Sequence, residues 1–343
     1  MDLDSIIRLL QEWTNRVPLI ILGSGASVSY GLPTMGVLGE YLKNTISFSD
    51  KADQKQFDKF KTTFEKIKDL ESTLSQIQLR SNVSNSIIIR TWELVNRLDL
   101  EVYNRLLNDA NDFPLSDLTN YLLATAKRKL SIVTTNYDRM AEYAASLSNA
   151  FICTGFAHNY YGHFSKNIHQ YDLTKLPGFK GQINIWKVHG SLDWFKSNEV
   201  TDLHLHLPLQ QTIPVNHKPL IVTPGLSKYY ETHNEPFRTI FSEADNEIEK
   251  ADTYLCIGYG FNDLHVQPKL INQIKGGKPI IVLTKELTPK TKQEIIGSNC
   301  KQYLLFEQAN TKDTRVYSNK FSGPEIIKNV NYWTLKEYLK LLK

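Results

Sequence analysis

The segment LIILGSGASVSYGLPT, residues 19–34, most constrains the fold, because a short aliphatic run ends abruptly in glycines and small hydroxyl residues. Residues 18–22 are typical of a strand buried on both faces of a parallel sheet. Gly23 and Gly25 would supply a tight turn, and a helix starting just after them would direct its N–H groups at a ligand. The segment predicts either a diphosphate-binding turn or an ordinary strand-to-helix turn. A dehydrogenase-type G-x-G-x-x-G is disfavoured because Val28 stands at the third glycine position.

The same pattern, an apolar run followed by small or polar residues, recurs along the chain. The segments are KLSIVTTNYDRM from Lys129, INIWKVHGS ending at Ser191, KPLIVTPG ending at Gly225, ADTYLCIGYGFND ending at Asp263, and a last strand KPIIVLT ending at Thr284. Strands separated by helical stretches predict an α/β fold with a doubly wound parallel sheet. Its ligand is expected at the carboxyl ends of the strands, where the polar residues lie.

Residues 41–129 differ in character from the rest of the chain. Glycine is absent from residues 40–154, and apolar residues at spacings of three and four begin at Phe57. This spacing is typical of amphipathic helices whose apolar stripe forms a core. We therefore expect an α-helical insertion at 41–129, within a nucleotide-binding domain made of residues 1–40 and 130–343.

Composition excludes several classes of protein. The 343 residues carry 40 Lys and Arg against 36 Asp and Glu, a net charge of +4 without a long basic run, which argues against direct binding to nucleic acid. Cys153, Cys256 and Cys300 are too few and too far apart for a disulfide framework or a four-thiolate zinc site. The acidic N-terminal segment is unlike a signal peptide, and no apolar run approaches the roughly 20 residues of a membrane span. A cytoplasmic location without membrane attachment is expected.

Four strand-exit segments, in this order, resemble the sirtuin family. GSGASVSYGLP resembles its first glycine-rich NAD loop, TTNYD the segment with its catalytic Asn, VHGS the segment with its catalytic His, and GYGFND its second NAD loop. The resemblance implies a Rossmann-type NAD-binding domain. It implies catalytic roles for Asn136, His189 and Asp138, and contacts to NAD from Gly23, Ser24, Gly25, Ser27, Pro33, Thr135, Gly258, Tyr259, Asn262 and Asp263.

The chain also departs from the protein-deacylating sirtuins. No cysteine lies between His189 and Cys256, where their zinc ribbon has its ligands, so no zinc is expected. PTMG replaces their Pro-Asp-Phe-Arg, and VTPGL from Val222 replaces the segment that aligns the acylated peptide. The resemblance therefore implies a sirtuin-like NAD hydrolase of bacterial antiphage defence, with NAD as substrate and nicotinamide and ADP-ribose as products. The alternatives are an NAD-dependent protein deacylase and a non-catalytic NAD or nucleotide sensor.

The residue types suit NAD cleavage, although each has a structural alternative. The Asn136 amide can donate to and accept from a ribose hydroxyl or water without adding charge, or it is a turn residue. His189 can act as a base near neutral pH, or it is a hydrogen-bonded structural histidine. Asp138 holds the nicotinamide end or caps the next helix, and Asn262 and Asp263 accept from ribose hydroxyls or cap a helix.

The alternating residues around His204 and His206 predict an exposed strand rather than a metal site, because no third ligand is evident.

A constitutive NAD hydrolase would exhaust the NAD of its own cell, so control is expected. About 60 residues follow Thr284, fewer than the roughly 100 to 150 typical of a separate sensor domain. Control is therefore expected from another protein. The resemblance implies pairing with a HerA-type hexameric DNA-translocating ATPase, and such a ring favours a homo-oligomer of this chain.

Overall fold

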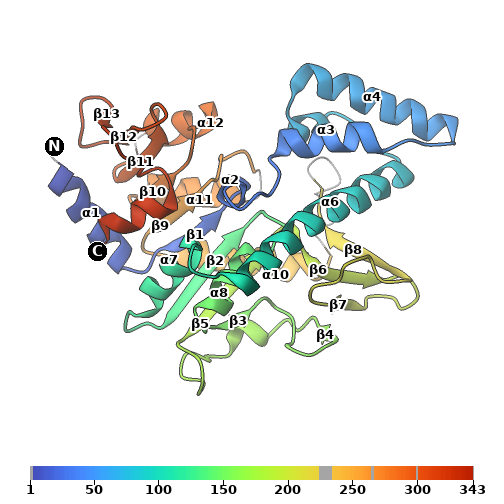
Figure 1. Ribbon diagram of the computed structural model, residues 1–343, viewed down its shortest axis with the longest axis horizontal. Helices are drawn as coiled ribbons and strands as arrows, with labels where there is room; N and C mark the ends of the chain where they lie inside the picture. Colours follow the sequence, from blue (N-terminus) through green and yellow to red (C-terminus); the bar gives the residue numbers. More distant parts are fainter. Residues whose placement is uncertain (1–2, 224–233, 264–265, 299, 343) are drawn as a thin grey trace.

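The computed structural model describes residues 3–223, 234–263, 266–298 and 300–342. Within them a nine-stranded sheet has the order β13-β12-β11-β10-β9-β1-β2-β5-β3, and its strands from β3 to β11 are parallel (Figure 1). The strands are β1 (Leu19–Leu22), β2 (Lys129–Thr134), β3 (Phe151–Cys153), β5 (Gln182–Lys187), β9 (Tyr254–Ile257), β10 (Ile280–Leu283), β11 (Tyr303–Gln308), β12 (Thr314–Ser318) and β13 (Glu325–Ile327). The predicted α/β fold with a parallel sheet is confirmed.

Strand β1 lies in the middle of the sheet, and all four of its residues are buried, as its aliphatic composition predicts. From β1 the chain continues to β2 on one side, and it later returns to β9 on the other side. The strand order therefore reverses between β1 and β9. In doubly wound sheets this is the point at which ligands bind, outside the carboxyl ends of the strands.

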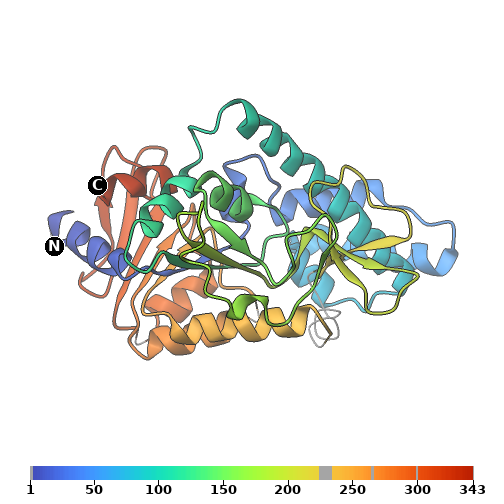
Figure 2. The same ribbon diagram turned by 90° about the horizontal axis from the view of Figure 1, so that it is seen from below.

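Helices cover both faces of the central sheet (Figure 2). One face packs against α1 (Leu3–Asn15), α7 (Pro114–Leu123), α8 (Met140–Leu147), α13 (Leu335–Tyr338) and η3 (Leu339–Leu341). The other packs against α10 (Phe237–Lys250), α11 (Val266–Lys275) and the π-helical turn η2 (Lys292–Ile296), which follows α12 (Pro289–Thr291). The two ends of the chain meet, because Thr14 Oγ1 lies 3.0 Å from Tyr338 Oη. In the part of the chain described, no helix combines the length and apolarity that crossing a membrane requires.

A helical unit projects from the side of the sheet and has its own hydrophobic core (Figure 1). It consists of α3 (Met35–Thr45), α4 (Lys51–Ile67), α5 (Leu70–Ser75) and α6 (Ser81–Asn108). The phenylalanines that predict an amphipathic helix, Phe57, Phe60 and Phe64, form the buried face of α4. Helix α7, although it falls within the predicted insertion, packs on the central sheet rather than in this helical core. The predicted boundaries of the insertion, residues 41 and 129, stay a prediction.

The prediction that KPLIVTPG forms a strand of the parallel sheet is wrong. Its residues form β8 (His217–Ile221), which pairs antiparallel with β6 (Gly190–Ser197) in a second sheet of order β4-β7-β6-β8, while Pro224 and Gly225 lie outside the described residues. The other strands of this sheet are β4 (Gly162–His163) and β7 (His204–His206). A short apolar run between turn residues does not distinguish a central parallel strand from a hairpin strand, which explains the error.

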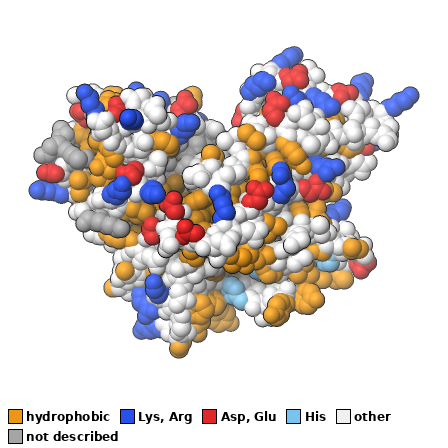
Figure 3. Space-filling view, viewed as in Figure 1, with side chains coloured by type: hydrophobic (Ala, Val, Ile, Leu, Met, Phe, Trp, Pro, Cys, Tyr) orange, Lys and Arg blue, Asp and Glu red, His pale blue; other side chains and the backbone are white. Residues whose placement is uncertain are grey.

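The prediction for the C-terminal region is also corrected by the structure. The predicted strand at Lys278–Thr284 is β10, but it is not the last, because β11 extends the parallel sheet and β12 and β13 add an antiparallel edge. The expected C-terminal amphipathic helix is only α13 and η3. Figure 3 shows positive and negative side chains interspersed over the visible face, without a continuous basic patch.

Candidate active site

The turn after β1 and the turn after β9 are in direct contact. Gly23 N donates to Ile257 O and Gly25 N donates to Gly258 O, both at 3.1 Å. A Cβ on Gly258, whose φ is +57°, would lie 2.1 Å from Ala26 N. These glycines therefore let two strand-exit turns touch each other, a role that the sequence analysis did not consider beside ligand binding.

Asn136 lies at the exit of β2, and its side chain is fixed by the turn after β1. Its Nδ2 donates to Gly23 O at 2.9 Å and to Ser27 Oγ at 3.1 Å, and its backbone N donates to Thr134 Oγ1 at 3.0 Å. The residue is 8% exposed. Because both amide protons are used, and no described residue donates to Oδ1, this oxygen is the part of the side chain left for a ligand.

Asp138 is buried two residues further along, next to the same serine. Its Oδ1 accepts from Met140 N at 3.2 Å at the start of α8, so it caps that helix, and it also interacts with the Ser27 hydroxyl. Burial raises the pKa of Asp138 from 3.8 to about 6, although the Lys187 ammonium opposes this. Lys187 also donates to Asp138 O and lies 3.1 Å from Glu142 Oε1. Asp138 is thus a carboxyl group that titrates near neutral pH.

These side chains line a narrow cavity of about 30 Å³, enough for one or two waters. The sheet side is formed by Ser24, Ser27, Pro33, Thr135, Asn136 and Asp138, all of which the sequence analysis selects. The opposite side is formed by Met35 and Leu38 of α3 and Val95 of α6. The helical unit therefore closes this cavity, which is called the narrow cavity below.

A second cavity, of about 830 Å³, lies on the other side of α2 (Gly25–Val28) and is called the wide cavity below. It is at the carboxyl ends of β1, β9, β10 and β11, the position expected from the strand order. Gly25 and Gly258 are the predicted residues in its wall. Sequence reasoning missed Tyr30, just after α2, and the residues on later strands and the C-terminal segment, including Leu283, Gln308 and Trp333.

His189 and Asp263 are brought together, but neither lines the two cavities. His189 lies in the turn between β5 and β6, and its Nε2 is 2.9 Å from Asp263 Oδ2, although no hydrogen bond of normal geometry is formed. Asp263 Oδ1 accepts from Val266 N at 2.9 Å, so it caps α11. Of the other predicted residues on this turn, Tyr259 is buried with its hydroxyl unpartnered among the described residues, and Asn262 is exposed.

The turn with His189 is connected to the segment with Asn136 through Val222. Val222 N donates to His189 O at 2.8 Å, and Tyr137 Oη donates to Val222 O at 2.7 Å. Leu192 N also donates to Tyr137 O at 3.1 Å. The two predicted catalytic segments are therefore parts of one hydrogen-bonded structure.

Arg139 is a residue that sequence reasoning missed. It is 2% exposed; its Nε lies 2.7 Å from Asp193 Oδ1 on β6, its Nη2 donates to Asn96 Oδ1 at 2.7 Å, and its backbone N donates to Asp99 Oδ2 at 2.7 Å. Burial alone would raise the pKa of Asp193, but Arg139 and His206 hold it at about 2. Arg139 thus anchors the segment after Asp138 to α6. Its partners are too distant in the sequence for a local sequence pattern to reveal these contacts.

Among the described residues, no group of three or more His, Cys, Asp or Glu side chains is arranged to hold a metal. The three cysteines are buried free thiols. His204 and His206 lie on strand β7, where His204 is buried and His206 Nε2 is 3.7 Å from Asp193 Oδ2. The strand is as predicted, but its exposure is not, because this small sheet packs against other elements.

Comparison with known proteins finds one family model that matches part of the chain. No curated protein matches the chain. Among solved structures, one described as a Sir2 homologue in complex with NAD is 15% identical and covers 89% of this chain and 88% of its own, with a TM-score of 0.43. One on the mechanism and regulation of Sir2 enzymes is 14% identical, with coverages of 85% and 91% and a TM-score of 0.45. The model of the SIR2-like domain matches residues 130–292, a little under half of the chain. Residues 130–292, which run from β2 to the first residue of η2, are therefore similar to a SIR2-like domain.

Proposed function

We propose that this chain is an enzyme that cleaves NAD between nicotinamide and ribose, giving nicotinamide and ADP-ribose. The observation that carries the proposal is the pair of unequal cavities at the point where the strand order reverses, separated only by the turn after β1 and α2. The similarity of residues 130–292 to a SIR2-like domain supports it, because this part contains Asn136, Asp138 and His189.

The wide cavity suits the adenosine half of the dinucleotide. Its volume of about 830 Å³ is within the range of nucleotide pockets, and Tyr30 and Trp333 offer aromatic surface for a base. In the turn between the cavities, the N–H groups of Gly23, Gly25, Ala26 and Ser27 donate within the chain, and among the described residues the N–H of Ser24 does not. The Ser24 N–H is thus the turn donor left for a phosphate oxygen.

The narrow cavity suits the bond that breaks. Nicotinamide leaves from NAD as a neutral molecule, so the protein has only to stabilise positive charge on the ribose and to position water. Asn136 Oδ1 would accept from a ribose hydroxyl or the water, and the ionised Asp138 carboxylate would stabilise the positive ribose. His189 is the candidate base for a ribose hydroxyl or water, provided that bound NAD extends towards it.

The narrow cavity must enlarge before it can hold a nicotinamide ring. About 30 Å³ is too small for a six-membered ring, and the movable wall is formed by Met35 and Leu38 of α3. We propose that α3 moves outward when NAD binds, and that its return excludes bulk water from the reacting bond.

The test is incubation with NAD followed by chromatography of the products, with no acylated peptide present. We expect nicotinamide and ADP-ribose from the wild-type chain, and neither from Asn136→Ala. Nicotinamide release only after an acyl-lysine peptide is added would instead identify a protein deacylase. Tight NAD binding without turnover, with partner proteins present, would identify a sensor.

The biological role belongs to the same proposal. We propose that the chain acts in antiphage defence as a homo-oligomer whose NAD turnover is controlled by a HerA-type hexameric ATPase. Light scattering on the purified chain tests the oligomer, and NAD assays with and without the ATPase test the control. A fully active monomer that is indifferent to the ATPase would contradict this part of the proposal alone.

A further inference from the structure

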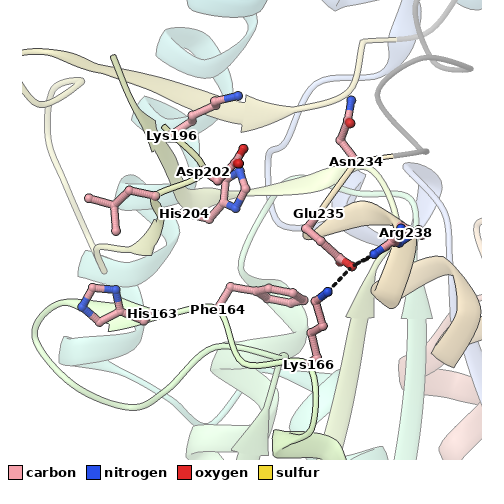
Figure 4. A pocket seen from close by; sticks show the side chains of 10 residues that line it. His163, Phe164, Lys166, Lys196, Asp202, His204, Asn234, Glu235 and Arg238 are labelled. Carbon is pink, nitrogen blue, oxygen red and sulfur yellow. Dashed lines mark hydrogen bonds and ion pairs between the residues drawn. The ribbon is translucent and has the colours of Figure 1, made fainter. Parts of the chain in front are cut away.

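A third cavity, of about 620 Å³, lies between the small antiparallel sheet and the start of α10, and its walls share no residue with the narrow or the wide cavity (Figure 4). Its volume is typical of a small-molecule site. Neither the motifs in the sequence nor the proposed reaction uses it. We call it the lateral cavity.

Two cations in its wall are held by one carboxylate. Glu235 Oε1 lies 3.2 Å from Lys166 Nζ and 2.7 Å from Arg238 Nη2 (Figure 4). Glu235 is itself fixed, because its Oε2 accepts from Thr239 N at 3.3 Å in α10. The arrangement leaves the two cations side by side with only one negative charge between them. Such a pair is suited to a further anion, since Arg and Lys both bind phosphate oxygens.

A third cation comes from the sheet. Lys196 on β6 is exposed and lies directly opposite His204 on β7. Within the described residues no carboxylate forms an ion pair with Lys196. The pKa of His204 is lowered, first by burial and then by the positive charge of Lys196. Three permanent cations and two carboxylates, Glu235 and Asp202, therefore line the cavity, and Lys196 lies across it from Lys166 and Arg238 (Figure 4).

An aromatic ring completes the wall. Phe164 is partly exposed, and its ring is held edge-on against Phe156 at a centroid distance of 5.3 Å. Figure 4 shows the ring beside the ion pair of Lys166 and Glu235. A planar ring next to clustered cations is the combination that binds a nucleobase by stacking and its phosphate by charge.

We propose that the lateral cavity binds a nucleotide, with its phosphate beside Lys166 and Arg238 and its base against Phe164. The site is independent of the proposed NAD cleavage, because none of these residues lies in the narrow or wide cavity.

The test measures protection of single lysines, so that a nucleotide in the wide cavity does not interfere. The full chain is labelled by reductive methylation with and without ADP, and the rate at each lysine is read by mass spectrometry. We expect ADP to slow labelling of Lys166 several-fold, and to leave the labelling rate of Lys66 on α4 unchanged. An unchanged labelling rate at Lys166 in saturating ADP would overturn the proposal.

Variants and simpler probes make the assignment sharper. Arg238→Gln is expected to raise the ADP concentration needed for half-protection of Lys166 about tenfold, as for loss of one hydrogen bond to a charged group. Lys66→Gln, which removes the same charge elsewhere, is expected to leave it unchanged. Asn136→Ala should also leave it unchanged, which separates this site from the proposed catalysis. Equal protection by inorganic phosphate would overturn the role of the base, and equal protection by adenosine would overturn the role of the phosphate.

Discussion

The narrow and wide cavities share the turn after β1 as a wall, yet they are built in different ways. The wide cavity, about 830 Å³, is formed by the carboxyl ends of four parallel strands and a C-terminal segment. The narrow cavity, about 30 Å³, is formed by hydrogen-bonded polar side chains that the helical unit covers. Under the proposed function, the sheet edge would provide room for binding, and the helical unit would enclose the side chains proposed to act in catalysis. Substitutions in the two cavities should therefore affect different kinetic constants.

The largest effect is expected from Asn136→Ala. This change removes the acceptor Oδ1 from the narrow cavity and should lower kcat for NAD cleavage by about 10²- to 10⁴-fold, as for loss of a positioned catalytic group. KM should change little, because the wide cavity is intact. Steady-state kinetics measure kcat and KM, and circular dichroism checks that the variant is folded. Asn272→Ala, at an exposed position on α11, is the control. Turnover like that of the wild type in Asn136→Ala would refute the site.

Asp138→Asn tests the cost of burying a charge in the narrow cavity. The pKa of Asp138 is raised from 3.8 to about 6, so the folded protein favours the protonated carboxyl over the ionised one. The stability associated with the protonated form is fully present below pH 3.8 and is lost as the pH rises through 6. Asn resembles the neutral form at every pH. We therefore expect the variant and the wild type to be equally stable near pH 4, and the variant to be more stable by about 3 kcal/mol at pH 8.

Urea unfolding at both pH values, without NAD, measures the difference. NAD cleavage by Asp138→Asn should fall although the protein is more stable, because the negative charge beside the ribose is lost. A variant less stable than the wild type at pH 8 would show that the charged form is favoured in the folded protein.

Much of the narrow cavity could be predicted from sequence, and little of the wide cavity could. Asn136 and Asp138 follow a strand that is next to β1, so local pattern and strand order bring them to the turn at Gly23. Trp333 lines the wide cavity although β11, β12 and β13 lead outward to the edge of the sheet, so the segment after β13 has to turn back to reach it. Arg139 depends on partners 40 and 54 residues away. Such contacts depend on tertiary packing, and neither periodicity nor turn residues encode them.

Trp333→Ala addresses the wide cavity. Loss of the indole removes surface on which the adenosine half would pack, and its effect should be the same in the ground state and the transition state. We expect KM for NAD to rise about tenfold while kcat is nearly unchanged. Tyr332→Ala is the matched control, since this neighbouring aromatic residue does not line the cavity. A fall in kcat with unchanged KM would show that the two cavities do not divide binding and chemistry as described.

The smallest effect is expected from removal of metal ions, because neither cavity provides the ligands for one. A structural zinc needs about four thiolate or imidazole ligands, and a catalytic zinc needs three from the protein. In the chain as described, no three or more potential ligands converge, and Cys153, Cys256 and Cys300 are buried as separate free thiols. The positive charge that forms on the ribose would be stabilised by Asn136 and Asp138 instead. NAD cleavage and the unfolding temperature should therefore be unchanged after prolonged chelation and dialysis. Stoichiometric zinc in elemental analysis, or activity lost on chelation and restored by zinc, would contradict this account of the site.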